Sequence, residues 1–194
     1  MKVALTFDDG PSEWTEPILD ILDAAGARAT FFVLGENVKG REQIVRRTAA
    51  AGHEIGNHTF THPWLQGRPR DEIGRELTAA EELIERVVLQ RPRVFRAPYL
   101  ATDEAVLEVA RELGYGEPVA GALFEDWNRG DGEGIALDIL AAVDRGEQLL
   151  VLHDGRPPRE STSRPDREPT VEAVRSIVPE LLARGAELVT VSEL

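Results

Sequence analysis

The chain has 194 residues, which suits a single domain spanning residues 1–194 and is enough to bury a core. Its formal net charge of −13 argues against nucleic acid as a partner, because most of the surface would repel a polyanion. The chain has no cysteine, which excludes disulfides, thiolate metal sites and cysteine nucleophiles.

Apolar, β-rich runs alternate with amphipathic stretches along the whole chain. The predicted strands are residues 3–7, 29–34, 54–57, 94–96, 119–124, 149–152 and 188–191. The predicted helices are residues 16–25, 41–51, 71–88, 103–113, 137–144 and 171–184. Repeated βα units imply an α/β fold with a mostly parallel sheet and helices packed outside it. Seven such units favour an incomplete barrel.

Polar residues follow these strands at their carboxyl ends, where the chemistry of such folds gathers. In chain order they are Asp8, Asp9, His58, Arg96, Asp126, Trp127 and His153. Residues far apart in sequence are therefore expected to meet at one rim. The Arg-, Pro- and Ser-rich stretch 155–168 is predicted to be a mobile loop beside it.

His58 and His62 in HTFTH are four residues apart, so a helical turn or a compact loop brings both imidazoles to one side. A pair at this spacing can also be a solvated surface feature. The Asp pair at a strand end favours a metal site, because two His and one carboxylate leave positions open for water and substrate. Either Asp8 or Asp9 completes the set, and a capped turn is the alternative reading of TFDDGPS.

His153 follows LLVL at the end of a buried strand, where an imidazole needs a partner. It is predicted to donate a proton to a leaving group, with a satisfied core histidine as the alternative. Arg96 suits holding a carboxylate ionised and oriented, or else forms a plain ion pair. Tyr99 and Trp127 are candidate walls of a sugar pocket. His53 lies at the start of its strand and is predicted to be structural.

Five short motifs occur in order along the chain. They are TFDDG at 6–10, HTFTH at 58–62, RAPY at 96–99, EDW at 125–127 and LVLHDG at 150–155. Together they resemble the motifs of polysaccharide deacetylases, the NodB-homology domain of family four carbohydrate esterases. The resemblance implies a distorted, incomplete (β/α)7 barrel in which Asp9, His58 and His62 hold a divalent metal. That metal is usually zinc, with cobalt or another divalent ion as a substitute.

The same resemblance implies a role for each remaining residue. Asp8 would be the general base toward the attacking water, positioned by Arg96, and the backbone N–H of Tyr99 would stabilise the oxyanion. His153, supported by Asp126, would protonate the departing amine.

The resemblance also places the acetyl pocket and shows where this chain departs from the family pattern. Trp127, with the apolar Val151 and Leu152 region, would shape the pocket for the acetyl methyl group. Leu123 and Ala120 stand where the family commonly has Asp and Trp, and Leu100 stands where glycine commonly follows the Tyr. These departures affect the pocket wall and leave the core chemistry in place.

The expected function is hydrolysis of N-acetyl groups on an N-acetylglucosamine-containing glycan or oligosaccharide, with release of acetate. An O-acetyl esterase acting on a sugar such as xylan is the nearest alternative, and a noncatalytic carbohydrate-binding relative is the next.

No apolar run approaches the roughly 18 residues that a membrane span requires. The opening residues MKVALTFDDG also lack the apolar core of a signal peptide. We therefore expect a cytoplasmic protein without a membrane span, or an extracellular one if these residues were trimmed from a longer chain. A cytoplasmic enzyme would meet chitooligosaccharides, lipid- or nucleotide-linked amino sugars, or acetylated antibiotic precursors.

Overall fold

The structure is a computed structural model that describes residues 1–159 and 166–194. The strands of the described chain form one parallel sheet in the order β3–β2–β1–β5–β4, and β6 pairs with the first residues of β1. The strands are β1 (Lys2–Asp8), β2 (Thr30–Val33), β3 (Glu54–Asn57), β4 (Ala122–Leu123), β5 (Leu149–His153) and β6 (Glu187–Leu188). The central strand β1 therefore has β2 and β5 as its neighbours at the end that carries the Asp pair.

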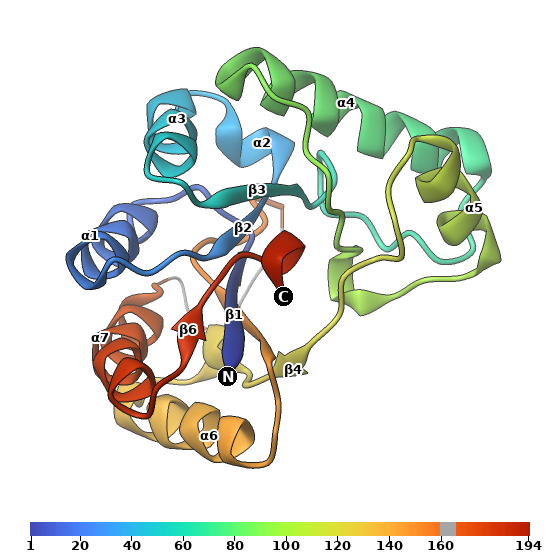
Figure 1. The fold of residues 1–194 in the computed structure, drawn as a ribbon. Helices are drawn as coiled ribbons and strands as arrows, with labels where there is room; N and C mark the ends of the chain where they lie inside the picture. The colour runs from blue at the N-terminus through green and yellow to red at the C-terminus, as the bar shows by residue number, and fades with distance from the viewer. Residues whose placement is uncertain (160–165) are drawn as a thin grey trace.

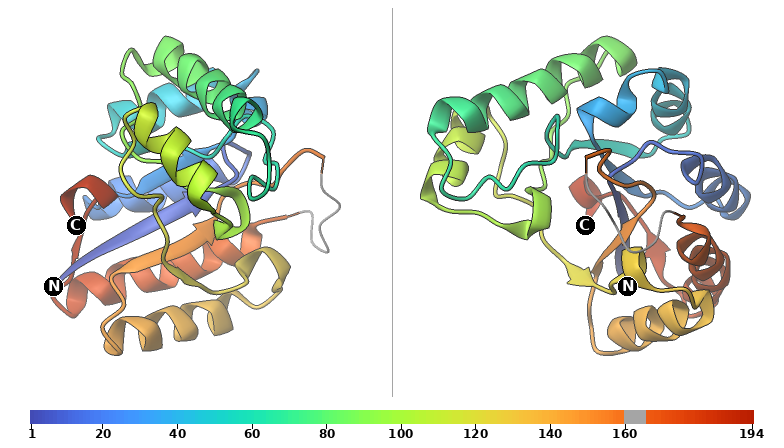
Figure 2. Two further views of the ribbon diagram at one scale, coloured as in Figure 1. Left: turned by 90° about the vertical axis from the view of Figure 1, so that its right-hand side faces the viewer. Right: turned by 180° about the vertical axis from the view of Figure 1, so that it is seen from behind.

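Helices surround the sheet, as Figures 1 and 2 show. They are α1 (Thr15–Ala25), α2 (Gly35–Val38), α3 (Glu42–Ala50), α4 (Arg70–Val88), α5 (Glu104–Glu112), α6 (Gly132–Asp144) and α7 (Glu168–Ala183). Short 3-10 turns cover Pro98–Leu100, Asp126–Asn128 and Val191–Glu193. The sequence pattern did not predict the single turn α2. It predicted a start of α6 five residues later than the observed one, because the GEG run at the start of this helix carries no amphipathic signal.

The predicted strand at 94–96 is reduced to one bridge, in which Phe95 pairs with Asn57. The backbone N–H of Arg96 donates to the carbonyl of Asn57 at 3.0 Å, and that of Val119 donates to the carbonyl of Phe95 at 2.8 Å. Pro92 and Pro98 flank this segment and cannot donate to a longer ladder. The regular sheet therefore does not close between β3 and β4, and the predicted incomplete α/β barrel is confirmed.

Side chains alternate along β1, and this alternation positions the site. Val3, Leu5 and Phe7 belong to the main core cluster between the sheet and the outer helices. Thr6 and Asp8 therefore point to the opposite side, into the barrel, where both are buried. A second apolar cluster joins α4, α5 and the segment around Phe95. Within the described residues, no helix combines the length and apolar character that crossing a bilayer requires.

Candidate active site

The two carboxylates at the end of β1 diverge because the chain turns sharply between them. Asp8 ends the strand, whereas Asp9 has a φ of 69°, in the left-handed region. The side-chain amide of Asn37 on α2 donates to the Asp9 carbonyl at 2.7 Å and to the Arg156 carbonyl at 2.9 Å. Gly155 lies so close that a Cβ there would collide with the Asp9 carbonyl oxygen. The strained backbone of Asp9 is therefore held from two sides.

HTFTH forms a compact loop after β3 and is not a helical turn. Thr59 and His62 both have positive φ values, 70° and 62°. The Asn57 side chain accepts a hydrogen bond from the Thr59 N–H at 2.8 Å, and the Thr59 hydroxyl accepts one from the His62 N–H at 3.1 Å. The loop thereby brings the His58 and His62 rings within 5.1 Å of each other.

Glu76 on α4 holds the middle of this loop. Its carboxylate accepts hydrogen bonds from the backbone N–H groups of Phe60 (3.0 Å) and Thr61 (2.8 Å) and from the Thr61 hydroxyl (2.7 Å). The sequence did not predict this contact, because one glutamate among several on an acidic helix carries no local signal that it holds a loop.

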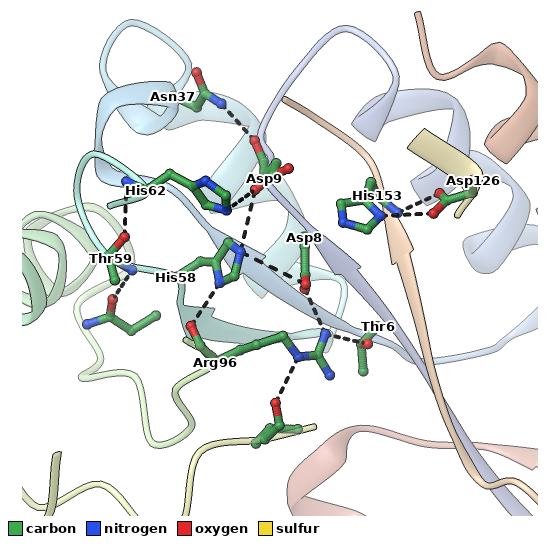
Figure 3. A network of polar contacts seen from close by, with 12 residues as sticks. Thr6, Asp8, Asp9, Asn37, His58, Thr59, His62, Arg96, Asp126 and His153 are labelled. Carbon is green, nitrogen blue, oxygen red and sulfur yellow. Dashed lines mark hydrogen bonds and ion pairs between the residues drawn. The ribbon is translucent and has the colours of Figure 1, made fainter. Parts of the chain in front are cut away.

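Asp9, His58 and His62 form a buried cluster whose candidate ligand atoms all lie within 4.8 Å of one another. Asp9 Oδ1 is 3.4 Å from Nε2 of His58 and 3.4 Å from Nε2 of His62. Figure 3 shows both imidazoles pointing toward the Asp9 carboxylate. Asp9 Oδ1 is buried and accepts no hydrogen bond. Carboxylate oxygen and imidazole nitrogen are ligands that suit zinc and similar divalent ions.

The protonation pattern of the cluster also fits a cation. His58 Nδ1 lies 2.8 Å from the Arg96 carbonyl, which only accepts, so Nδ1 carries the hydrogen and Nε2 keeps its lone pair. Burial alone would raise the pKa of Asp9, but the adjacent His58 imidazole and the charges of His62 and His153 lower it overall. Burial alone would lower the pKa of His58, but Asp8 and Asp9 raise it overall. The cluster is thus electron-rich and attracts positive charge.

Asp8 is paired with Arg96, a fully buried arginine that reaches across the barrel interior. Arg96 Nη1 donates to Asp8 Oδ1 at 2.7 Å and to the Thr6 hydroxyl at 2.7 Å, and Nε donates to the Val119 carbonyl at 3.0 Å. The guanidinium also lies over the Phe32 ring, 4.2 Å from its centroid. The other Asp8 oxygen is 3.9 Å from His58 Nε2, so it faces the cluster.

His153 ends β5 next to Asp8 in register and is paired with Asp126. Nδ1 of His153 lies 2.9 Å from one Asp126 oxygen, and the backbone N–H of His153 donates to the other at 2.8 Å. Thr170 on α7 donates to that second oxygen at 2.8 Å. Burial lowers the pKa of His153, but the adjacent carboxylate raises it to about 9 overall. Trp127 packs edge-on against the imidazole, with 4.8 Å between ring centroids.

These groups line a cavity of about 290 Å³ at the carboxyl ends of the strands. Its lining comprises Asp8, Asp9, His58, His62, Ala97, Tyr99, Leu100, Leu123, Trp127, His153, Pro157 and Arg167. Tyr99 and Trp127 therefore lie at the cavity, and their contact with a sugar stays a prediction. His53 lies elsewhere, buried against Phe31 with Nδ1 accepting from the Ala29 N–H at 3.2 Å.

Val151 and Leu152 are the exception, because neither lines the cavity and both are fully buried. Leu152 points outward into the main core, opposite to His153 on the same strand. Val151 shares the face of His153 but lies two residues earlier, below the rim. The predicted contribution of these two residues to the acetyl pocket therefore stays a prediction, and Leu100, Leu123 and Pro157 supply apolar lining at the cavity surface.

Arg167 is a buried arginine that the sequence analysis missed. Its Nε donates to the Gly155 carbonyl at 2.8 Å, and burial lowers its pKa. It lies in the stretch 155–168, where several arginines look alike in sequence. Pro157 and Arg167, one on each side of the gap, line the cavity, whereas 160–165 lie outside the described residues, so the predicted mobile loop stays a prediction.

Comparison with known proteins agrees with the geometry. Residues 1–118 match the family model described as polysaccharide deacetylase. The chain belongs to the polysaccharide deacetylase family. It is 38% identical over 192 residues to a chitooligosaccharide deacetylase from Bradyrhizobium sp. (strain ANU 289), covering 96% of this chain and 87% of that one.

Two solved structures superpose on nearly the whole length of this polysaccharide deacetylase. The Bc1960 peptidoglycan N-acetylglucosamine deacetylase superposes with a TM-score of 0.87 at 33% identity, covering 99% of this chain and 86% of that one. A family 4 acetyl xylan esterase from Clostridium thermocellum, in complex with a cobalt ion, superposes with a TM-score of 0.83 at 33% identity, covering 100% and 89%. The family resemblance of the five motifs is confirmed.

Proposed function

We propose that this polysaccharide deacetylase is a metal-dependent hydrolase that removes N-acetyl groups from an N-acetylglucosamine-containing glycan or oligosaccharide and releases acetate. The observation that carries the proposal is the meeting of three arrangements in one cavity. A carboxylate and two histidines form the buried cluster, Asp8 is held by Arg96, and His153 is held by Asp126. Each arrangement would meet one requirement of acyl hydrolysis. The cluster would bind a cation, Asp8 would be the base and His153 would be the acid.

Asp9, His58 and His62 would hold the metal, which we propose to be zinc, with cobalt or another divalent ion as a substitute. The buried Asp9 oxygen without a hydrogen-bond partner supports this assignment. A divalent ion held there would supply Lewis acidity, which would polarise the acetyl carbonyl and make a nearby water more acidic.

Asp8 would accept the proton of the attacking water. One of its oxygens is fixed by Arg96 and the other faces the cluster, so the acceptor oxygen needs no reorientation. The backbone N–H of Tyr99, a residue that lines the cavity, would donate to the oxygen on which negative charge develops.

His153 would protonate the leaving group. Its raised pKa, about 9, keeps the imidazole charged at neutral pH. An amine leaves as a neutral molecule only after it gains a proton, whereas an alkoxide depends on protonation less. The acid held by Asp126 therefore favours an amide substrate over an ester, although one similar structure is named an acetyl xylan esterase.

A noncatalytic carbohydrate-binding protein would be expected to have lost the base or a ligand. Here the proposed base, the three candidate ligands and the proposed acid all line one cavity. This retention favours the enzyme over the binding protein. The proposed partner is an N-acetylated sugar, and the net charge of −13 argues against a nucleic acid.

The test is acetate release from chitooligosaccharides by the purified protein, measured before and after chelation and after addition of zinc or cobalt. We expect release that chelation abolishes and the metal restores, and slower release from acetylated xylan oligosaccharides. Absence of acetate from every acetylated glycan, with metal bound, would overturn the enzyme proposal. Faster release from xylan than from chitooligosaccharides would instead favour the esterase.

A further inference from the structure

Two exposed aromatic side chains lie side by side at the edge of the cavity. Trp64 is 51% exposed and Tyr99 is 49% exposed. Their ring centroids are 5.2 Å apart and their planes are inclined by only 31°. Large apolar side chains in contact and half open to solvent are a surface feature that commonly marks a binding site.

The pair leads away from the proposed metal site. Tyr99 packs edge-on against His62, with 4.7 Å between ring centroids, and lines the cavity. Trp64 contacts Tyr99 and is not part of the cavity lining. A ligand that fills the cavity and extends past Tyr99 would therefore meet the indole next.

The backbone around Trp64 is fixed although its side chain is exposed. His62 on one side is buried in the cluster, and Leu65 on the other is fully buried in the second apolar core. The Trp64 carbonyl accepts a hydrogen bond from Arg68 Nε at 2.7 Å. The indole is thus presented by a rigid segment, which limits the entropy lost on binding.

The chemistry of the pair selects its occupant. Neither ring carries a charge, and the neighbouring Arg68 is engaged with the Trp64 carbonyl and with Glu72. Aromatic faces take up flat, apolar surfaces, and the C–H face of a pyranose ring is such a surface in an otherwise polar and uncharged molecule. A sugar linked to the reacting unit satisfies both the chemistry and the position.

We propose that Trp64, together with Tyr99, binds the sugar unit next to the one being deacetylated, and that this contact sets how strongly longer oligosaccharides are preferred over short ones. This inference rests on the proposed function and names a residue that determines its chain-length preference. Trp64 is a specificity-determining residue in this view and takes no part in the proton transfers.

The test compares wild type with Trp64→Ala on N-acetylglucosamine oligomers of one to six units, by acetate release at saturating zinc. We expect kcat/KM for the long oligomers to fall about tenfold in the variant through KM, as loss of part of an indole contact predicts, with kcat nearly unchanged. The shortest oligomer that is turned over should change less than about twofold. Trp64→Phe should restore most of the loss.

Leu137→Ala is the matched control, because Leu137 is an exposed apolar residue on α6 that lies outside the cavity lining. An equal effect of Trp64→Ala on every oligomer, or no effect on any, would overturn the proposal. So would a wild-type enzyme that shows no preference for longer chains. A surface for a second copy or another protein is the remaining alternative, and that outcome would show unchanged glycan kinetics.

The experiment separates this inference from the proposed function. Acetate release by the wild type tests the enzyme assignment, whereas only the dependence on chain length tests Trp64. If no acetate is released, calorimetric binding of the same oligomers to Asp8→Asn decides the question. Equal affinity of Asp8→Asn and of the double variant Asp8→Asn/Trp64→Ala for long oligomers would then overturn the inference.

Discussion

Replacing Asp126 with asparagine removes the charge that keeps His153 protonated. The carboxylate accepts hydrogen bonds from Nδ1 of His153 at 2.9 Å and from its backbone N–H at 2.8 Å. Burial lowers the pKa of His153, but this carboxylate raises it from the ordinary value of 6.5 to about 9 overall. Because the raised pKa favours the acid form, activity that needs this form persists at neutral pH and is lost as the pH rises through about 9.

In Asp126→Asn, burial still lowers the pKa of His153 but the main charge that raises it is gone. We therefore expect this pKa to fall to its ordinary value of 6.5 or below. At pH 8, a group of pKa 9 is about 90% protonated and a group of pKa 6.5 is about 3% protonated, so kcat/KM should fall about 30-fold. A cation bound at Asp9 repels the imidazolium and lowers both values. The difference between the two proteins is therefore the quantity to measure.

The assay is the pH dependence of kcat/KM at saturating zinc for wild type and Asp126→Asn. The alkaline limb should move to lower pH by about 2.5 units or more in the variant, because the pKa of His153 falls from about 9 to 6.5 or below. Thr170→Val is the matched control, because it removes a hydrogen bond to Asp126 but keeps the charge, and its limb should stay close to that of the wild type. An unmoved limb in Asp126→Asn, with metal content and fold intact, would refute the assignment of His153 as the acid.

Three further substitutions test the contacts that support the site. Arg96→Ala leaves the buried Asp8 without its partner and should cost about 3–5 kcal/mol of unfolding free energy in urea titrations, whereas a loss below about 1 kcal/mol would contradict the pairing. Glu76→Ala releases the HTFTH loop and should weaken zinc binding at least about tenfold in a competition titration. Glu72→Ala is its control, and equal zinc affinities of the two variants would exclude a role of Glu76 in holding the metal ligands. Gly155→Ala forces a Cβ against the Asp9 carbonyl and should cost about 1–3 kcal/mol by urea unfolding, unlike Gly116→Ala, which has open space; equal stabilities would contradict the close approach.

The positions of the candidate site residues could be predicted from the sequence because each residue follows a strand of one parallel sheet. In that sheet β1 lies between β2 and β5. Parallel strands place their carboxyl ends at one edge, so Asp8 and His153 become direct neighbours in register. The same rule brought His58 to that edge through β3. The five motifs therefore identified the family and the convergence of residues that are up to 145 positions apart, from Asp8 to His153.

Other features depended on tertiary contacts that leave no local pattern. Glu76 reaches the HTFTH loop only because α4 folds back over it. Arg167 cannot be told apart from the neighbouring arginines until its burial is known. Leu152 packs in the main core although it precedes His153 directly, because successive residues of a strand face opposite sides of the sheet. Location in the cell and the extent of the domain stay predictions.

The division of labour between the two aspartates is the central claim, and measuring bound zinc and acetate release in the same samples of Asp8→Asn and His58→Ala tests it most directly. Asp8→Asn should keep zinc near the wild-type level while acetate release falls at least about 100-fold, because the base is lost but the three ligands remain. His58→Ala should lose both zinc and activity. Equal loss of zinc in the two variants would contradict the account, because Asp8 would then be a ligand.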